Sequence, residues 1–383
     1  MQYILSSMAC ACALGRTNAD VLANGLAGSL AGMVSLPGDI PGRDIYFGLV
    51  PGELPPIAEP EFDMRTNRLL LHAVQSLRTE LDDFLARYAS SRVAIVLGAS
   101  NTGIDEAQQN VDRWLDAGAK PSEMYFSQIE LGTPVDYLKR LLGVKGPAYT
   151  VSTACSSSTK AFAAARRLIE LGIVDAAIVG GVDGRCRFAM NGFHALGALA
   201  QERCRPLAED RDGINLGEGV ALFTLEKVEK SERDGRVEVC LAGCGESSDA
   251  YHATAPDPEG HGAEAAMRAA LADAGMMPAD IVYLNLHGTG TQANDSMEMK
   301  AVGRVFDLPE SATVPPFDLA GVRPVIESTK SMTGHCLGAA GAIEAAICWL
   351  YISSGHVKGP AMSNSFAFGG SNASVILAPR EAK

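Results

Sequence analysis

The sequence predicts an α/β fold built from two similar halves. Three observations lead to this expectation. Short apolar runs typical of buried strands alternate with alanine-rich helical segments. Each of the two alanine-rich segments ends at a glycine, which is typical of a helix C-terminus. The same order of elements then recurs in the second half of the chain, and such alternation is typical of sheets covered by helices.

In the first half, residues 92–98 and 148–153 read as strands, the first of them ending in glycine. Residues 155–172 follow as a helix that is rich in alanine and stops at its terminal glycine. Residues 174–181 then read as a buried strand, and residues 217–225 as a glycine turn that leads into another strand.

The second half repeats this order. Residues 281–286 read as a strand, residues 336–355 as an alanine-rich helix, and residues 368–377 as a glycine turn followed by a strand. Each alanine-rich helix begins beside a residue suited to chemistry, Cys155 in the first half and His335 in the second. If a pseudo-two-fold axis relates the halves, we expect both helix N-termini to converge on one site.

The polar run of residues 227–235 is the best boundary between the halves. We therefore expect an N-terminal half over residues 1–234 and a C-terminal half over residues 235–383. Residues 1–15 superficially resemble a signal peptide, but no positive charge precedes their apolar part. We interpret them as an opening strand and turn.

Composition excludes several function classes. The net charge of −13 argues against a nucleic-acid partner, because phosphate binding needs a basic surface. No uninterrupted apolar run reaches 18 residues, so no membrane span is expected. The nine cysteines are odd in number and scattered, which favours free thiols in a reducing, cytoplasmic compartment. The pairs Cys10/Cys12 and Cys240/Cys244 lack further ligands at zinc-site spacing, so no metal site is predicted.

Cys155 stands where a strand ends and a helix begins, in the segment Thr153-Ala-Cys-Ser-Ser-Ser158. The unpaired N–H groups and positive end of a helix favour a thiolate and could also stabilise an oxyanion. The alternative is a buried packing cysteine whose neighbouring serines cap the helix.

Three further segments carry polar groups on glycine-rich backbone. His287 ends a strand and is followed by Gly-Thr-Gly-Thr, which allows a ligand to approach the chain closely. Lys330 and His335 lie on one loop that enters a helix of small residues. Residues 364–372 could present N–H groups to an anion. Each has a plain structural alternative: a structural histidine in a capped turn, a satisfied core histidine, or a loop between strands.

Together these segments resemble those of the β-ketoacyl-acyl-carrier-protein synthases, and most closely the elongating Cys-His-His branch. The resemblance covers nearly the whole chain. The motifs that carry it, in family order, are residues 153–158, 205–213 with Gly217-Glu-Gly, 247–252, 287–291, 330–335 and 366–372.

The resemblance implies a thiolase-like fold, with duplicated α/β halves in a five-layer α-β-α-β-α arrangement, usually as a homodimer. It implies a transferase, an acyltransferase that moves an acyl chain from the phosphopantetheine of an acyl carrier protein to Cys155. A decarboxylative Claisen condensation with malonyl-carrier protein follows. His287 and His335 would hydrogen-bond the malonyl thioester carbonyl and stabilise the enolate. No cofactor and no metal are implied.

The resemblance also assigns supporting roles. Lys330 would form a buried charge network with Asp295 and Glu298, because a buried lysine needs a carboxylate. The acidic residue in the helix after His335 is Glu344, which is expected to be structural.

Three residues would contact the substrate. Thr289 and Thr291 would hold the pantetheine arm, and Phe368 would gate the acyl pocket. The backbone N–H groups of Phe368 and Cys155 would form a second oxyanion hole. An acidic carrier protein needs a local basic patch on this acidic chain. Arg65 and Arg68 are the candidates for it, and Arg205 is a weaker one; the alternative is an ordinary solvated helix face.

Several departures from the family leave the substrate open. The opening turn, which is normally glycine-rich in the family, has only Gly15 within residues 8–15. Residues 98–150 and 184–205 are shortened where the family lines its acyl pocket and dimer contact. The serines after Cys155 resemble those of polyketide-type synthases, as in an aryl-polyene-type member. Three interpretations follow: fatty acid biosynthesis, polyketide or polyene biosynthesis in a homodimer or with a synthase-like partner, or a non-catalytic chain-length-factor-like subunit. The last normally lacks the nucleophile.

Overall fold

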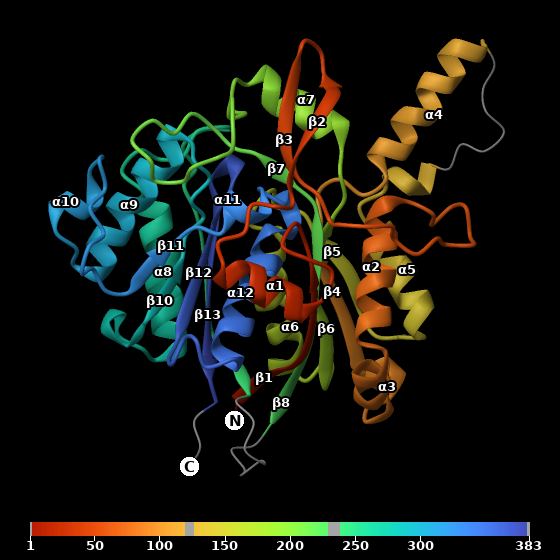
Figure 1. Ribbon diagram of the computed structural model, residues 1–383. Coiled ribbons are helices and arrows are strands. Elements are labelled where there is room, and N and C mark those ends of the chain that lie inside the picture. The colour runs from red at the N-terminus through yellow and green to blue at the C-terminus, as the bar shows by residue number, and fades with distance from the viewer. Residues whose placement is uncertain (1, 119–125, 229–237, 381–383) are drawn as a thin grey trace.

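The computed structural model describes residues 2–118, 126–228 and 238–380. Ten of its strands form one continuous sheet in the order β11-β10-β12-β13-β9-β1-β8-β6-β4-β5 (Figure 1). The strands from the first half are β1 (Gln2–Ala11), β4 (Val93–Gly98), β5 (Ala148–Val151), β6 (Ala176–Asp183) and β8 (Gly219–Val228). Those from the second half are β9 (Val239–Ser248), β10 (Tyr283–Asn285), β11 (Val325–Glu327), β12 (Ala361–Phe366) and β13 (Ser371–Pro379).

The two sets of five strands have the same topology. In the first, β4 lies parallel between β5 and β6, while β6, β8 and β1 are successively antiparallel. In the second, β10 lies parallel between β11 and β12, while β12, β13 and β9 are successively antiparallel. A short antiparallel pairing of β1 with β9 joins the sets. The repeated order of elements that the sequence predicts is thus present, although the expected boundary between residues 234 and 235 lies outside the described residues.

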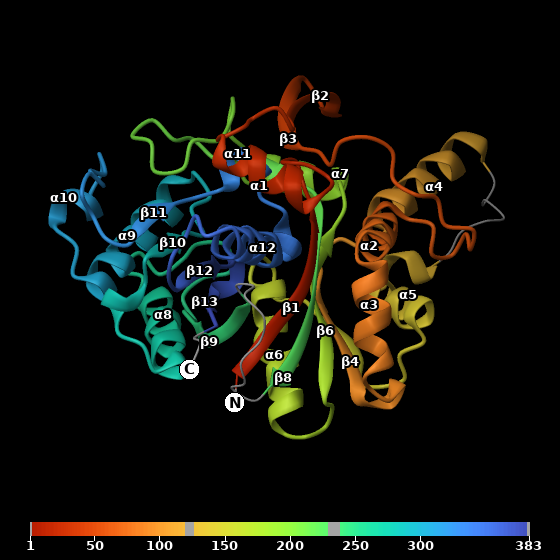
Figure 2. The same cartoon turned by 60° about the horizontal axis from the view of Figure 1, so that its bottom comes forward.

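Helices form three layers around these strands (Figure 2). The middle layer consists of α6 (Ser157–Glu170), which packs on β4 and β6, and α12 (Ala340–Ser353), which packs on β12 and β13. The outer helices are α2 (Arg65–Ser76), α3 (Arg78–Ala86) and α5 (Thr133–Leu142) on the first half, and α8 (His261–Ala274) and α9 (Gln292–Phe306) on the second. The α-β-α-β-α arrangement is confirmed.

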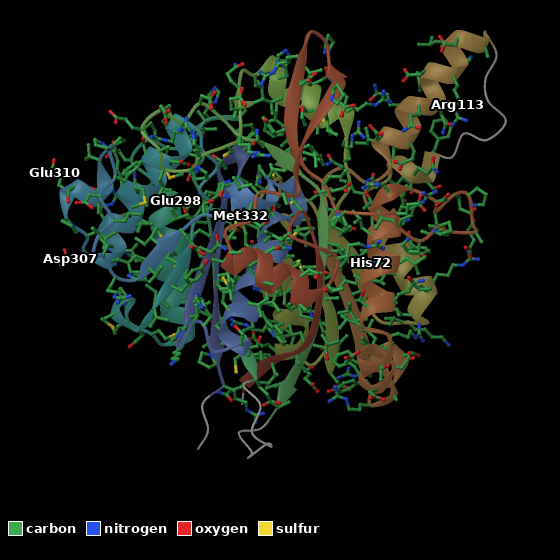
Figure 3. All side chains as sticks on the ribbon, viewed as in Figure 1. His72, Arg113, Glu298, Asp307, Glu310 and Met332 are labelled. Carbon is green, nitrogen blue, oxygen red and sulfur yellow. The ribbon has the colours of Figure 1, made fainter. Side chains whose placement is uncertain are left out.

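The remaining elements lie around this core. A small sheet contains β2 (Met33–Ile40), β3 (Arg43–Gly48) and β7 (Leu216–Gly217). The other helices are α1 (Asn18–Leu26), α4 (Ile104–Ala117), α7 (Arg187–Ala195), α10 (Glu310–Thr313) and α11 (Lys330–Thr333). Helix α4, which carries Arg113, projects from the body of the molecule (Figure 3). Over the described ranges, no helix combines the length and apolarity needed to cross a membrane.

The N-termini of α6 and α12 meet at the centre of the molecule, as the sequence predicts. Small residues allow this approach, because a Cβ atom on Gly341 would overlap the Thr159 hydroxyl. The backbone N–H of Ala342 in α12 donates to Oγ of Ser158 in α6 at 2.9 Å. The residues that precede the two helices, Cys155 and His335, are therefore brought together.

Candidate active site

Cys155 lies at a sharp turn between β5 and α6. The turn depends on Ala154, whose φ of 52° places it in the left-handed region that is unfavourable for alanine. Two serines stabilise the turn: Ser157 Oγ accepts from the backbone N–H of Thr153 at 2.9 Å, and Ser156 Oγ donates to the Thr153 carbonyl. The serines therefore hold the turn through their side chains. Cys155 is buried, with 6% of the residue exposed.

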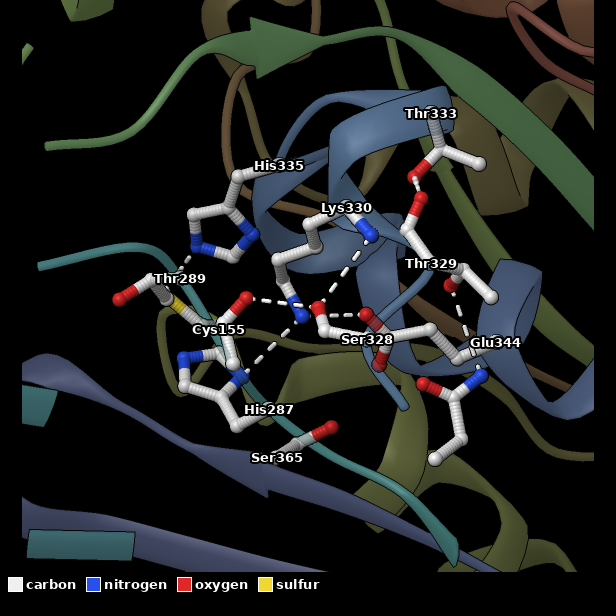
Figure 4. A network of polar contacts seen from close by, with 12 residues as sticks. Cys155, His287, Thr289, Ser328, Thr329, Lys330, Thr333, His335, Glu344 and Ser365 are labelled. Atoms are coloured by element: carbon white, nitrogen blue, oxygen red, sulfur yellow. Dashed lines mark hydrogen bonds and ion pairs between the residues drawn. The ribbon is translucent and has the colours of Figure 1, made fainter. Parts of the chain in front are cut away.

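His287 and His335 both lie against this thiol. Nε2 of His335 is 2.9 Å from Sγ of Cys155, and the two imidazole rings are nearly perpendicular with centroids 5.4 Å apart (Figure 4). Sγ of Cys155 and one ring nitrogen of each histidine all lie within 4.8 Å of one another. The structure thus brings together the three residues that the sequence identifies as nucleophile and partners.

Lys330 lies on the other side of His287, and its side chain is buried. Its Nζ forms an ion pair with Oε1 of Glu344 and lies 3.4 Å from Nδ1 of His287 (Figure 4). The expected pairing of Lys330 with Asp295 and Glu298 is wrong, since the buried ammonium is neutralised by Glu344 from α12. From the sequence, Glu344 was expected only to have a structural role. Its pairing with Lys330 depends on how α11 packs against α12, and the spacing of the two residues along the chain does not reveal that packing.

Asp295 and Glu298 instead hold the loop that follows His287. Glu298 accepts from the backbone N–H groups of His287 at 2.8 Å and Gly288 at 2.7 Å. Asp295 accepts from Gly290 and lies 3.5 Å from the buried guanidinium of Arg211. Both carboxylates therefore fix the loop backbone from α9. Sequence reasoning missed Arg211, although it lies within the family motif of residues 205–213.

Burial changes the acid–base properties of the site. It raises the pKa of Cys155 to about 11, against the opposing effects of the Lys330 charge and of the backbone N–H groups of Phe368 and Cys155. The expected preference for a resting thiolate is therefore wrong, because desolvation of the charge outweighs the donors at the helix end. Burial and the charge of Lys330 also hold the pKa values of His287 and His335 well below the ordinary range, so both imidazoles are neutral.

A cavity of about 360 Å³ leads to these three side chains. Thr289 and Thr291 line it, and their hydroxyl oxygens are 3.1 Å apart. Phe368 also lines it, 38% exposed, with its ring against Phe193. The three residues are thus placed where a thioester arm could reach Cys155, and their roles stay predictions. Phe193, on α7, was missed because a single partly buried aromatic residue on a short helix carries no motif.

The two predicted docking arginines are engaged within the molecule. Nε and Nη2 of Arg65 both donate to the carboxylate of Glu218, whose side chain is fully buried. Arg68 forms a similar pair with Asp63, and both of those side chains are partly exposed. Contact of Arg68 with a carrier protein stays a prediction, whereas the guanidinium of Arg65 is directed inward.

Comparisons with known proteins agree with this geometry. Residues 68–231 match the beta-ketoacyl synthase N-terminal domain, and residues 239–361 match the beta-ketoacyl synthase C-terminal domain. The chain is 32% identical over 355 residues to 3-oxoacyl-[acyl-carrier-protein] synthase 2 of Staphylococcus aureus (strain COL), covering 83% of each protein.

Two solved structures are similar over the whole chain. One is the ketosynthase ApeO in complex with its chain length factor ApeC from Xenorhabdus doucetiae, with a TM-score of 0.88, 38% identity, and coverage of 99% of this chain and 98% of that chain. The other is the ishigamide ketosynthase/chain length factor, with a TM-score of 0.82, 27% identity and 99% coverage of each chain.

Proposed function

The chain belongs to the β-ketoacyl synthase family, and from this premise we propose that Cys155, His287 and His335 elongate carrier-bound acyl chains by decarboxylative condensation. The observation that carries the proposal is the 2.9 Å contact between His335 Nε2 and Cys155 Sγ, with a second neutral imidazole beside it. The enzyme is an acyltransferase of the 3-oxoacyl-[acyl-carrier-protein] synthase type, which serves fatty-acid or polyketide chain elongation.

In the first step, the sulfur of Cys155 attacks the acyl thioester while Nε2–H of His335 donates to it, and the thiol proton passes to the departing pantetheine sulfur. This transfer is needed because burial keeps the resting sulfur protonated. The N–H groups of Cys155 and Phe368 are directed at the sulfur and can stabilise the oxyanion that forms there. The pantetheine thiolate leaves with a proton, and the acyl group stays on Cys155.

In the second step, malonyl-carrier protein occupies the cavity with its thioester carbonyl between the two imidazoles. Each neutral ring donates an N–H to this oxygen, which stabilises the enolate as carbon dioxide leaves. The enolate carbon then attacks the acyl carbonyl, and the thiolate of Cys155 is expelled and reprotonated. The product is a carrier-bound 3-oxoacyl chain, longer by two carbons.

The alternative of a non-catalytic subunit is not favoured. A subunit kept only for interaction has no need of Cys155, two histidines and Lys330 in one buried network. For the same reason we retain an acyl carrier protein as the partner that delivers both substrates. A cytoplasmic location is likewise proposed, on the ground that all nine cysteines are free.

We further propose that the enzyme is a dimer, as a homodimer or with a synthase-like partner. The support is an exposed apolar surface on α4, α7 and residues 126–131, which lies beside a groove of about 240 Å³. Its members are Val111, Trp114, Leu115, Phe126, Ile129, Leu131 and Phe188. Patches of this kind mark protein interfaces. Mass measurement in solution, alone and with candidate partners, tests it.

The nucleophile is tested by intact-mass analysis after incubation with acyl-carrier proteins of several chain lengths. Wild type should gain one acyl group, and Cys155→Ala none. Cys186→Ala is a matched control, because Cys186 is also buried at the start of a helix, and burial raises its pKa to about 11 too. This control should still gain the acyl group. An unlabelled wild type, or a labelled Cys155→Ala, would refute the assignment.

A further inference from the structure

Glu218 is a buried carboxylate that the proposed chemistry does not use. It lies between β7 and β8, and its side chain is fully buried outside the cavity. Four donors from three segments meet at its two oxygens. Two come from the guanidinium of Arg65, one from the backbone N–H of Val50 at 3.0 Å, and one from that of Arg185 at 3.1 Å. This number of donors fixes the position of the carboxylate closely.

The residues just before Glu218 hold the main chain of His335. The N–H of His335 donates to the Asn215 carbonyl at 2.7 Å, and the N–H of Gly217 donates to the His335 carbonyl at 3.1 Å. The carbonyl of Glu218 itself accepts from the thiol of Cys336 at 3.4 Å. The backbone on both sides of the imidazole is therefore tied to residues 215–218.

The main chain of residues 215–218 lies in direct contact with that of residues 333–336, because glycines leave no side chain between them. A Cβ on Gly217 or Gly48 would overlap the Thr333 carbonyl, and a Cβ on Gly334 would overlap the Leu216 carbonyl. The N–H of Glu218 also donates to the Gly48 carbonyl at 2.9 Å. In a close-packed region, a shift of β7 is passed on to the segment that contains Thr333, Gly334 and His335.

We infer that Glu218 is a positioning residue, which sets the distance between His335 and Cys155 through the main chain of β7. This rests on the proposed function of that pair. Arg65 then acts as the counter-ion that holds Glu218 in place, which explains why its guanidinium points inward. Arg65 thus supports the imidazole of His335 through Glu218, in place of the carrier docking expected from the sequence.

The test compares Glu218→Gln with Glu226→Gln in the full-length protein. Glu226 is a matched control, since it is also buried on β8 and also receives two hydrogen bonds from one guanidinium, that of Arg87. It lies roughly 27 Å further along the strand, by the usual rise per residue. Melting temperature, malonyl decarboxylation kinetics and a crystal structure are measured for each variant.

We expect both variants to lose similar thermal stability. Only Glu218→Gln should lower kcat, at least tenfold relative to Glu226→Gln, with KM for malonyl-carrier protein changed less than twofold. Its crystal structure should show His335 Nε2 out of hydrogen-bond reach of Cys155 Sγ. A smaller loss in kcat, a raised KM with kcat retained, or an unchanged contact overturns the inference.

Glu218→Gln leaves Arg65 without its carboxylate, so Arg65→Met/Glu218→Gln provides a second variant with neither charge. It should reproduce the loss in kcat. If neither variant folds, Glu218 serves the fold rather than the site, and the inference is overturned. The distance between His335 Nε2 and Cys155 Sγ is measured in the crystal whether or not the wild type condenses substrates. An inactive wild type would therefore contradict the proposed function without deciding the positioning role of Glu218.

Discussion

Nζ of Lys330 lies 3.4 Å from Nδ1 of His287. An ammonium group only donates hydrogen bonds, so Nδ1 accepts and the ring proton is on Nε2, on the side that faces Cys155. Glu344 holds the ammonium from the opposite side (Figure 4). The buried ion pair between α11 and α12 thereby selects the tautomer in which His287 can donate to an enolate.

Replacement of Lys330 should therefore impair both stability and decarboxylation. Lys330→Met leaves the buried carboxylate of Glu344 without a cation, and breaking a buried pair in this way costs about 3–5 kcal/mol. The tautomer of His287 is also no longer fixed, so malonyl decarboxylation should fall at least tenfold. Thermal melting and a carbon dioxide release assay measure the two effects.

A double variant separates these effects. Lys330→Met/Glu344→Gln removes both charges, so most of the lost stability should return while decarboxylation stays low. Restored decarboxylation in the double variant would show that Lys330 acts only through stability, and the tautomer role would be wrong.

Decarboxylation should also stay constant as the pH is lowered through the ordinary range of histidine. Burial and the Lys330 charge hold the pKa values of His287 and His335 well below 6.5. Because the folded-state values are depressed, both rings stay neutral as the pH falls from 8 to 6. Rates measured at saturating malonyl-carrier protein over this range should agree within twofold. An acidic limb with a midpoint near 6.5 contradicts this.

The sequence could predict the fold and the reactive trio because both leave local signals. Apolar strands, glycine turns and the residues that surround Cys155, His287 and His335 are contiguous along the chain. The partner of Lys330 was predicted wrongly because ion pairing depends on how α11 packs against α12. The thiolate expectation failed for a similar reason, since the burial that raises the pKa of Cys155 comes from several distant segments. The hydrogen bonds of Arg65 likewise depend on packing, since their acceptor Glu218 lies 153 positions away.

Removal of metal ions should leave the enzyme active. The sulfur and nitrogen atoms of Cys155, His287 and His335 are close enough together to bind a metal ion. The proposed steps instead use these atoms as nucleophile and donors, and a bound ion would block attack by the sulfur. After dialysis against EDTA, acyl loading and condensation should match those of untreated enzyme within twofold. Lost activity that returns only with an added metal ion would contradict the proposed mechanism.

Glu298 should make the wild type less stable as the pH rises towards neutrality. Burial raises the pKa of this carboxyl from its ordinary 4.5 to about 7. The folded state therefore holds a proton that the unfolded chain has released. The stability due to this proton is fully present below pH 4.5 and is lost as the pH rises through about 7.

Glu298→Gln cannot titrate, so the difference in unfolding free energy between wild type and variant reports this carboxyl alone. From pH 6 to 7 the unfolding free energy of the wild type should fall relative to that of Glu298→Gln by up to about 1.4 kcal/mol. Above pH 8 the difference should become constant. Urea unfolding at half-unit steps of pH measures it. Glu259→Gln is the control, because Lys300 lowers the pKa of Glu259 and its difference should not change over this range. A constant difference for Glu298→Gln would show that this carboxyl is already ionised at pH 6.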